Sequence, residues 1–144
     1  MKKYLLIFTL VVLVASVARA DDKPATIDNL PPKAKHFLKE YFPNVAVSLV
    51  TRDDDLLFAE YGVVLDNGAH IDFTASGEWQ EVEMQQGSVP SGIIPQPVAE
   101  SVRKNYPNAH IVRIERSRRS CEVELSNGLE LTFDKHGRLR GIDD

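Results

Sequence analysis

The chain has little of several residue types, and each shortage excludes a class of protein. Cys121 is the only cysteine among 144 residues, so no disulfide can form within the chain. Lys and Arg number 17 against 21 Asp and Glu. The basic excess that favours binding to nucleic acid or to an anionic membrane is therefore missing. We predict a soluble acidic protein whose stability comes from its hydrophobic core.

Long hydrophobic runs are also missing, apart from one at the start of the chain. Two lysines precede an almost wholly apolar stretch over residues 5–17, and Ala18-Arg19-Ala20 supplies small residues before Asp21. This pattern predicts a secretory signal peptide over residues 1–20. A membrane anchor is the alternative, but the stretch is shorter than the roughly 20 residues needed to span a bilayer. No cysteine follows it, which disfavours a lipid anchor, and we expect a periplasmic or secreted protein.

Cleavage there would make the protein more acidic. The signal carries three of the 17 basic residues and no acidic one, so 14 basic residues would remain against 21 acidic residues, a net charge of −7. The 124 residues left from 144 suit one domain or two closely packed repeats.

One pattern occurs twice in those residues. FPNVAVSLV at 42–50 is echoed by YPNAHIVRI at 106–114, an offset of 64. The offset then becomes 60, so that Asn67-Gly68 matches Asn127-Gly128. We interpret the change of four residues as a longer turn in the first copy of a duplicated unit.

Each unit is predicted to begin with a short helix. Apolar residues recur with a spacing of three and four in both copies: Ala34, Phe37, Leu38 and Tyr41, then Val98, Val102 and Tyr106. Prolines precede both segments, which suits a first helical turn. Pro43 and Pro107 then end the helices, because the residue before a proline is pushed out of the helical region.

Four short strands should follow each helix, since apolar and polar residues alternate there. A two-residue Asn-Gly loop would send the apolar rows of the last hairpins to opposite faces. A three-residue loop ending in Gly128 instead pairs Leu125 with Leu129 and Val123 with Leu131, so we prefer it. The same device pairs Phe73 with Trp79 and Phe133 with Leu139. Val82 and Ile142 then fall on the opposite face, out of phase with the core.

The predicted fold class is α+β, with two tandem repeats of a helix and a four-stranded antiparallel meander. We favour one continuous eight-stranded sheet with the helices on one face, because joining the two meanders removes two exposed edges. After the signal peptide, the expected segments are a lead-in, the first repeat, a linker and the second repeat: residues 21–29, 30–83, 84–93 and 94–144.

The order of these motifs carries a family resemblance. LPPKAKHFLKEYFPN followed by a strand, then IPQPVAESVRKNYPN followed by a strand, with NG turns in both copies, resembles the PepSY-like family of β-lactamase-inhibitor-like periplasmic proteins. The resemblance covers nearly all of the mature chain. It implies an architecture similar to inhibitors that grip an enzyme with a sheet face, and related domains accompany peptidases. It supplies no catalytic residues.

The polar face of the sheet is the main candidate for a binding site. In the preferred register Glu124 lies opposite Glu130, and like charges that oppose each other weaken a sheet. One interpretation is a solvated face whose acids are balanced by nearby arginines. The other is a recognition surface for a basic protein or peptide. The candidate partner-binding residues are Glu122, Glu124, Glu130, Asp134, Arg138, Arg140 and Asp72.

Other candidates for chemistry are weaker. Asp53-Asp54-Asp55 lacks the ligand spacing of a calcium-binding EF-hand loop and is interpreted as a charged turn. The four histidines are scattered, with no zinc-site spacing, so we expect neither metal nor cofactor. Paired carboxylates can serve a hydrolase, but no pocket that would perturb their pKa values is indicated. Cys121 and Trp79 are expected in the core.

These observations favour an exported, non-enzymatic binding module that inhibits or modulates an envelope enzyme such as a peptidase. A small-ligand or glycan-binding envelope protein is the alternative, and a carboxylate-dependent hydrolase is a third. The partner's identity and the oligomeric state stay open.

Overall fold

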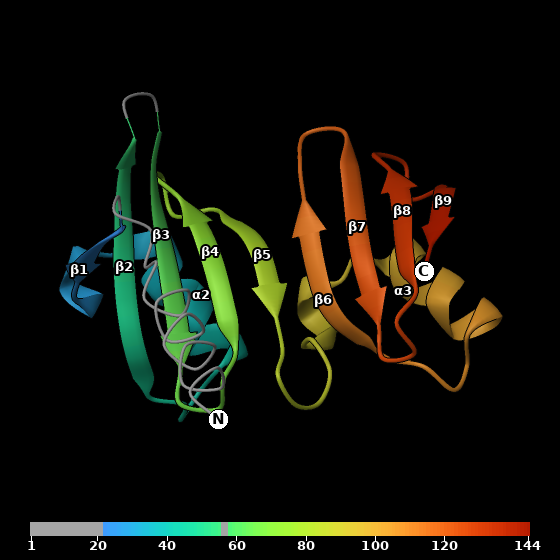
Figure 1. Cartoon of the computed structure of the whole chain (residues 1–144), viewed down its shortest axis with the longest axis horizontal. Helices are drawn as coiled ribbons and strands as arrows, with labels where there is room; N and C mark the ends of the chain where they lie inside the picture. The colour runs from blue at the N-terminus through green and yellow to red at the C-terminus, as the bar shows by residue number, and fades with distance from the viewer. Residues whose placement is uncertain (1–21, 56–57) are drawn as a thin grey trace, which may run out of the picture.

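The computed structural model describes residues 22–55 and 58–144, so the predicted signal peptide lies outside the described residues. The strands form one nine-stranded antiparallel sheet in chain order. Two α-helices lie behind it in the view of Figure 1. The elements are β1 (Asp22–Ala25), η2 (Ile27–Asn29), α2 (Pro32–Tyr41), β2 (Val47–Asp55), β3 (Phe58–Leu65), β4 (His70–Thr74), β5 (Trp79–Glu83), η3 (Ser91–Ile93), α3 (Gln96–Asn105), β6 (Ile111–Arg116), β7 (Ser120–Leu125), β8 (Glu130–Asp134) and β9 (Leu139–Asp143).

The predicted α+β class is confirmed, and so is the joining of the two meanders. β5 of the first repeat pairs with β6 of the second through Val82 opposite Ile114, and both side chains are fully buried. The eight predicted strands therefore form one continuous sheet. A ninth strand was not predicted: the lead-in segment contributes β1, which pairs with β2.

Both helices form where the apolar spacing predicts them. Their buried residues are Ala34, Phe37 and Leu38 in α2 and Val98 and Val102 in α3, and they belong to one core with the inward side chains of the sheet. Phe73 and Phe133, at matching places in the two repeats, are both fully buried in that core. Cys121 is buried, and Trp79 is half-buried with its ring centroid 6.3 Å from that of Phe37.

The register of the last hairpins confirms the three-residue loop. Leu125 donates its N–H to the carbonyl of Leu129 over 2.8 Å, and Val123 pairs with Leu131. Gly128 has φ of +91°, a left-handed conformation that costs glycine little and other residues more. This loop keeps the apolar side chains of β7 and β8 on one buried face.

The phase predicted for Val82 and Ile142 was wrong. A β-bulge occurs in β5 next to Gln80 and in β9 next to Arg140, and each inserts one extra residue into its strand. Val82 is thereby returned to the core side, opposite Ile71. Ile142 is likewise opposite Leu131, but it stays 52% exposed because β9 is an edge strand.

The charged turn predicted at Asp53-Asp54-Asp55 was also wrong, because these residues are the last three of β2. Asp55 pairs with Phe58 of β3, so the extra residues of the first repeat lengthen the hairpin strands. In the second repeat, the β6–β7 hairpin closes sooner, through a hydrogen bond from the Ser117 N–H to the Ser120 carbonyl.

Candidate functional site

The face of the sheet opposite the helices carries two rows of side chains that cross eight of the nine strands. Antiparallel pairing sets the order within each row, because directly opposed residues point to the same side. The first row is Thr51, Gly62, Asp72, Glu81, Glu115, Glu122, Thr132 and Gly141. The second row is Leu49, Val64, His70, Glu83, Arg113, Glu124, Glu130 and Asp143.

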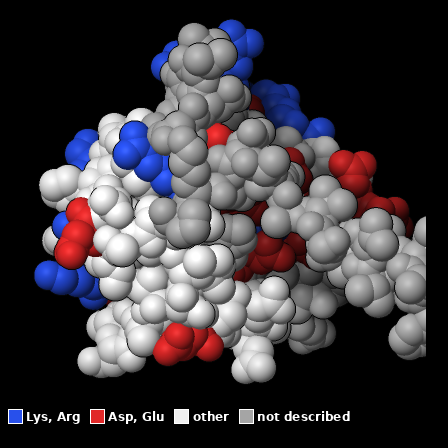
Figure 2. All heavy atoms as spheres, turned by 60° about the vertical axis from the view of Figure 1, so that its left-hand side comes forward, with Lys and Arg blue, Asp and Glu red and all other residues white. Residues whose placement is uncertain are grey.

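Carboxylates dominate the middle of both rows. We call this surface the open acidic face, and its residues are Asp72, Glu81, Glu83, Glu115, Glu122, Glu124, Glu130, Asp143 and the single arginine Arg113. In Figure 2, several Asp and Glu side chains lie on the right of the view, toward which this face is turned, and others lie at the left and lower edges, whereas Lys and Arg side chains lie mainly on the left and at the top. The surface spans both repeats, so neither repeat alone would present it.

Arg113 is the centre of the charge arrangement. Its Nε lies 2.6 Å from Oε1 of Glu81, and its terminal nitrogens lie 2.5 Å from Glu115 and 3.8 Å from Glu122. Partial burial alone would lower the pKa of Arg113, but the hydrogen bond to Glu81 and the nearby carboxylates outweigh it and raise that pKa. One guanidinium thus serves three carboxylates.

The remaining carboxylates keep an excess of negative charge. Burial and the charge of Glu130 raise the pKa of Glu122 above its ordinary value, although Arg113 acts in the opposite direction. Glu124 lies directly opposite Glu130, as the register predicted. Arrangements of this kind cost a sheet some tenths of a kcal/mol per pair. The fold therefore carries a charge pattern that does not stabilise it.

A histidine marks the first-repeat end of this surface. Nε2 of His70 lies 3.1 Å from Oδ1 of Asp72. The hydrogen bond to Asp72 raises the pKa of His70, while partial burial acts against it. The positive charge at this end of the face therefore grows as the pH falls.

The structure separates the seven predicted site residues into two groups. Four of them belong to the open acidic face: Asp72, Glu122, Glu124 and Glu130. Asp134, Arg138 and Arg140 form a second cluster at the β8–β9 turn. Oδ1 of Asp134 accepts the backbone N–H groups of His136 and Arg138, and Oδ2 lies 3.0 Å from Nε of Arg138 and 2.9 Å from Nε of Arg140.

The hydrogen bonds at this turn explain the electrostatics of Asp134. The N–H of Arg138 and the N–H of His136 stabilise its carboxylate and hold its pKa far below the usual range, with help from the Arg138 and Arg140 side chains. The oxygens of Asp134 are thus used by the turn, and we assign it a structural role.

Sequence reasoning missed five of the nine residues of the open acidic face. The missed residues are Arg113, Glu115, Glu81, Glu83 and Asp143. Two facts place them there, the β5–β6 pairing and the bulges near the starts of β5 and β9. Once the sheets are joined, the alternation around buried Ile114 is the sequence signal that would have located Arg113 and Glu115.

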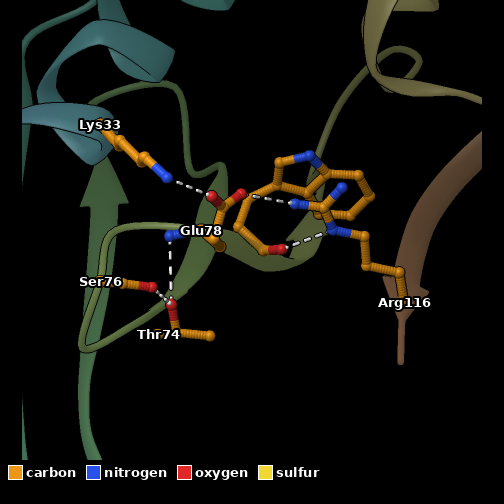
Figure 3. A network of polar contacts seen from close by, with 6 residues as sticks. Lys33, Thr74, Ser76, Glu78 and Arg116 are labelled. Carbon is orange, nitrogen blue, oxygen red and sulfur yellow. Dashed lines mark hydrogen bonds and ion pairs between the residues drawn. The ribbon is translucent and has the colours of Figure 1, made fainter. Parts of the chain in front are cut away.

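A second polar network joins the two repeats at the start of β5 (Figure 3). Glu78 accepts Nζ of Lys33 at 2.8 Å and a terminal nitrogen of Arg116 at 3.4 Å. Nε of Arg116 donates to the Trp79 carbonyl over 2.7 Å. The side chain of Arg116, from β6, thus binds the edge of the first repeat.

Within residues 22–55 and 58–144, no three His, Cys, Asp or Glu side chains are grouped in a way that could hold a metal ion. Over the same residues, no helix has the length and apolar character needed to cross a membrane.

The fold and its open face define a tandem helix-on-sheet protein, and comparison with known proteins places it in a family. The family described as "Putative beta-lactamase-inhibitor-like, PepSY-like" matches residues 59–141, more than half of the chain. This chain belongs to that PepSY-like family. No curated protein matches it.

Solved structures of similar proteins support this assignment. A protein of Bacteroides thetaiotaomicron described as a "putative calcium-regulated periplasmic protein" is 38% identical, with a TM-score of 0.84, and the match covers 88% of this chain and 100% of that one. A periplasmic protein of the DUF2874 family from Bacteroides vulgatus is 35% identical, with the same coverage and TM-score. Another periplasmic protein of unknown function from that species is 33% identical, with a TM-score of 0.81 over 85% of this chain and 99% of its own.

Proposed function

We propose that the mature chain is an exported, non-enzymatic binding module that docks its open acidic face onto a basic surface of an envelope protein. One observation carries the proposal: eight carboxylates and one arginine lie in two adjoining rows across both repeats. A surface of one charge sign steers a partner of the opposite sign and sets its orientation.

The energetics of the face support a role in recognition. Glu124 lies opposite Glu130, and the charge of Glu130 adds to burial in raising the pKa of Glu122, so carboxylates repel one another on this face. A basic partner would relieve this repulsion, so binding would be favoured by the same charges that weaken the isolated sheet. The open side of the sheet is continuous across both repeats, so a folded protein could contact both of them at once.

Family membership supports the location and the kind of partner. The structural neighbours are described as periplasmic, which agrees with the signal peptide expected at residues 1–20. The family description includes the words β-lactamase-inhibitor-like. We infer that the partner is an envelope enzyme, such as a peptidase, whose activity the bound module lowers.

The test is capture of envelope proteins by the mature chain and by two charge-reversed variants. The first variant carries Glu122→Lys, Glu124→Lys and Glu130→Lys on the open acidic face. The matched control carries Glu40→Lys, Asp66→Lys and Glu100→Lys, three exposed positions outside that face with the same total change of charge. Partners should be retained by the wild type and the control, be lost from the first variant, and be released by salt.

Equal recovery of every partner by all three baits would refute the proposal. Each captured protein must then be purified and its affinity measured, with at least a tenfold loss expected for the open-face variant. Because one neighbour is described as calcium-regulated, the measurement is repeated with Ca²⁺ and with a chelator. If binding is measured only with Ca²⁺, then a bridging cation joins the two proteins in place of direct charge pairing. That result would also contradict the proposal.

A further inference from the structure

The two repeats allow a comparison inside one molecule. Residues that only maintain the shared fold should be alike at matching positions, whereas a group of neighbouring differences marks a place where one copy has an additional role. Such a group surrounds the start of α3, where the β6–β7 hairpin and the β8–β9 turn approach the first repeat.

The first difference concerns the partner of an arginine. In the first repeat, Arg52 pairs with Tyr61, and its guanidinium lies 5.7 Å from the ring centroid of Tyr61. In the second repeat, Arg116 pairs with Cys121 in the same register. The small thiol supplies no ring, and Arg116 lies instead over Trp79, 4.0 Å from the ring centroid.

The missing ring coincides with a groove at the junction of the repeats. We call it the junction groove, and it has a volume of about 680 Å³. Ligand sites in proteins commonly measure roughly 300–1,000 Å³. Its lining includes Tyr41, Trp79, Pro97, Arg118, Cys121 and His136. The lining thus combines aromatic and proline side chains with residues of two polar turns.

The second difference concerns charge. The β8–β9 turn carries Lys135 and His136 where the first repeat has Ala75 and Ser76. The β6–β7 hairpin carries Arg118, whereas the corresponding hairpin of the first repeat contains Asp53-Asp54-Asp55. All three basic side chains are exposed and line the groove. Basic residues are thus concentrated at one place in a protein with a net negative charge.

The single carboxylate among the groove's lining residues does not cancel this charge. Asp134 is engaged by two backbone N–H groups and by the side chains of Arg138 and Arg140. Arg116 is held by Glu78 and by the Trp79 carbonyl, so it shapes the wall. Arg118, Lys135 and His136 are left to face an incoming anion.

We propose that the junction groove binds a carboxylate attached to an apolar or aromatic body, either a free organic acid or the C-terminus of a peptide. The basic side chains on the hairpin and the turn contact the carboxylate, because hydrogen bonds between charged groups are the strong ones. The apolar body lies against Tyr41, Trp79 and Pro97. This site is separate from the open acidic face and does not depend on the proposed docking function.

The chain offers a built-in reporter for the test. Trp79 is the only tryptophan and lines the junction groove, so the single indole N–H resonance of isotope-labelled protein responds to a ligand bound there. The probes are benzoate, the neutral analogue benzyl alcohol, and a short peptide ending in phenylalanine with either a free carboxylate or an amide. We expect a saturable shift with benzoate or with the free-acid peptide, and none with the two neutral probes.

Variants at the groove make the test specific, and those at Cys121, Lys135 and His136 introduce the residues of the first repeat. Combining Arg118→Ser, Lys135→Ala and His136→Ser should weaken binding by roughly tenfold or more, since two positive charges and a hydrogen-bonding imidazole are removed. Cys121→Tyr should abolish binding by filling the groove. The control variant Glu122→Gln with Glu124→Gln should bind the probes within about twofold of the wild type, because it changes only the open acidic face.

Several outcomes would overturn the proposal. Absence of a saturable shift with either acid would do so, as would equal binding of acid and neutral probes. An unchanged affinity in the triple variant would also contradict the proposal. If Cys121→Tyr does not fold, the triple variant alone tests the site. Because the probes are small acids and the docking partner is basic, failure here leaves the open acidic face to be judged by its own experiment.

Discussion

The guanidinium of Arg116 lies 4.0 Å above the ring centroid of Trp79 and donates a hydrogen bond to the carbonyl of the same residue over 2.7 Å. Arg116 ends β6, and Trp79 begins β5, so this contact crosses the boundary between the repeats. The β5–β6 ladder is short, with three opposed pairs. The contact therefore strengthens the junction at the place where the ladder stops.

We predict that Arg116→Ala lowers the free energy of unfolding by about 1–3 kcal/mol, because a cation–π contact and a charged hydrogen bond are lost together. Arg116→Lys should recover only part of this loss, since an ammonium cannot stack and donate in the same plane. Urea unfolding followed by Trp79 fluorescence measures both. Arg118→Ala, an exposed neighbour, is the control and should stay within about 0.5 kcal/mol of the wild type. If Arg116→Ala also loses no more than about 0.5 kcal/mol, the contact adds nothing to the stability of the junction.

Much of this architecture could be predicted from the sequence. Two copies of one proline-bounded pattern predicted both helices, and the requirement for one buried face selected the three-residue loop that Leu125 and Leu129 close. These features follow from local rules of backbone geometry and alternation, which act within a few residues of the chain.

The missed features depend on longer-range geometry. A bulge adds one residue without leaving a sequence signal, yet the bulge at Gln80 decides which face Glu81 and Val82 occupy, and the bulge at Arg140 does the same for Ile142. The full open acidic face needs β5 to pair with β6 as well. The junction groove could not be foreseen either, because it arises where segments about 80 residues apart in sequence, near Tyr41 and Cys121, come together.

The stability contributed by Arg113 should depend on pH. Arg113→Ala removes the cation that opposes the raised pKa of Glu122, so the folded-state pKa of Glu122 should rise further above its unfolded value. A carboxylate with a raised folded pKa destabilises the fold above its unfolded pKa, and the penalty disappears once the pH falls below that value. We expect a loss of about 1–3 kcal/mol at pH 7 that shrinks toward pH 4.

Chemical unfolding of the wild type and the variant at several pH values measures this difference. Arg138→Ala is the matched control, because Arg138 also pairs with a carboxylate but is 65% exposed. Its loss at pH 7 should stay below about 1 kcal/mol. A deficit for Arg113→Ala that is constant from pH 7 to pH 4 would mean that packing of the side chain, and not its charge, is what stabilises the sheet.

The thiol of Cys121 should react slowly in the folded protein. Burial raises its pKa to about 11 from 9.0, although the charge of Arg116 acts against the shift. At pH 8 the thiolate fraction is then lower by about a hundredfold, and only the thiolate reacts. Alkylation by iodoacetamide, followed by mass spectrometry, should be at least that much slower in buffer than in denaturant. Similar rates in the two conditions would contradict both the burial and the raised pKa.

The β8–β9 turn is pressed against the start of α3, and two glycines allow this contact to be measured. Gly128 and Gly137 both have positive φ, +91° and +77°. A Cβ at Gly128 would meet nothing within 4 Å, whereas one at Gly137 would lie 2.5 Å from Cβ of Pro97. Gly128→Ala therefore tests backbone strain alone, and Gly137→Ala tests strain together with the close approach of the turn to the helix.

We expect Gly128→Ala to lower the free energy of unfolding by about 1–2 kcal/mol, the usual cost of a left-handed conformation in a residue with a Cβ. Gly137→Ala should lower it by about 1–3 kcal/mol more, because Pro97 or the turn must shift. Thermal and urea unfolding of both variants measure the difference. Equal losses would show that the turn can move away from α3 at no cost. The position of His136 beside the junction groove would then not be fixed by packing.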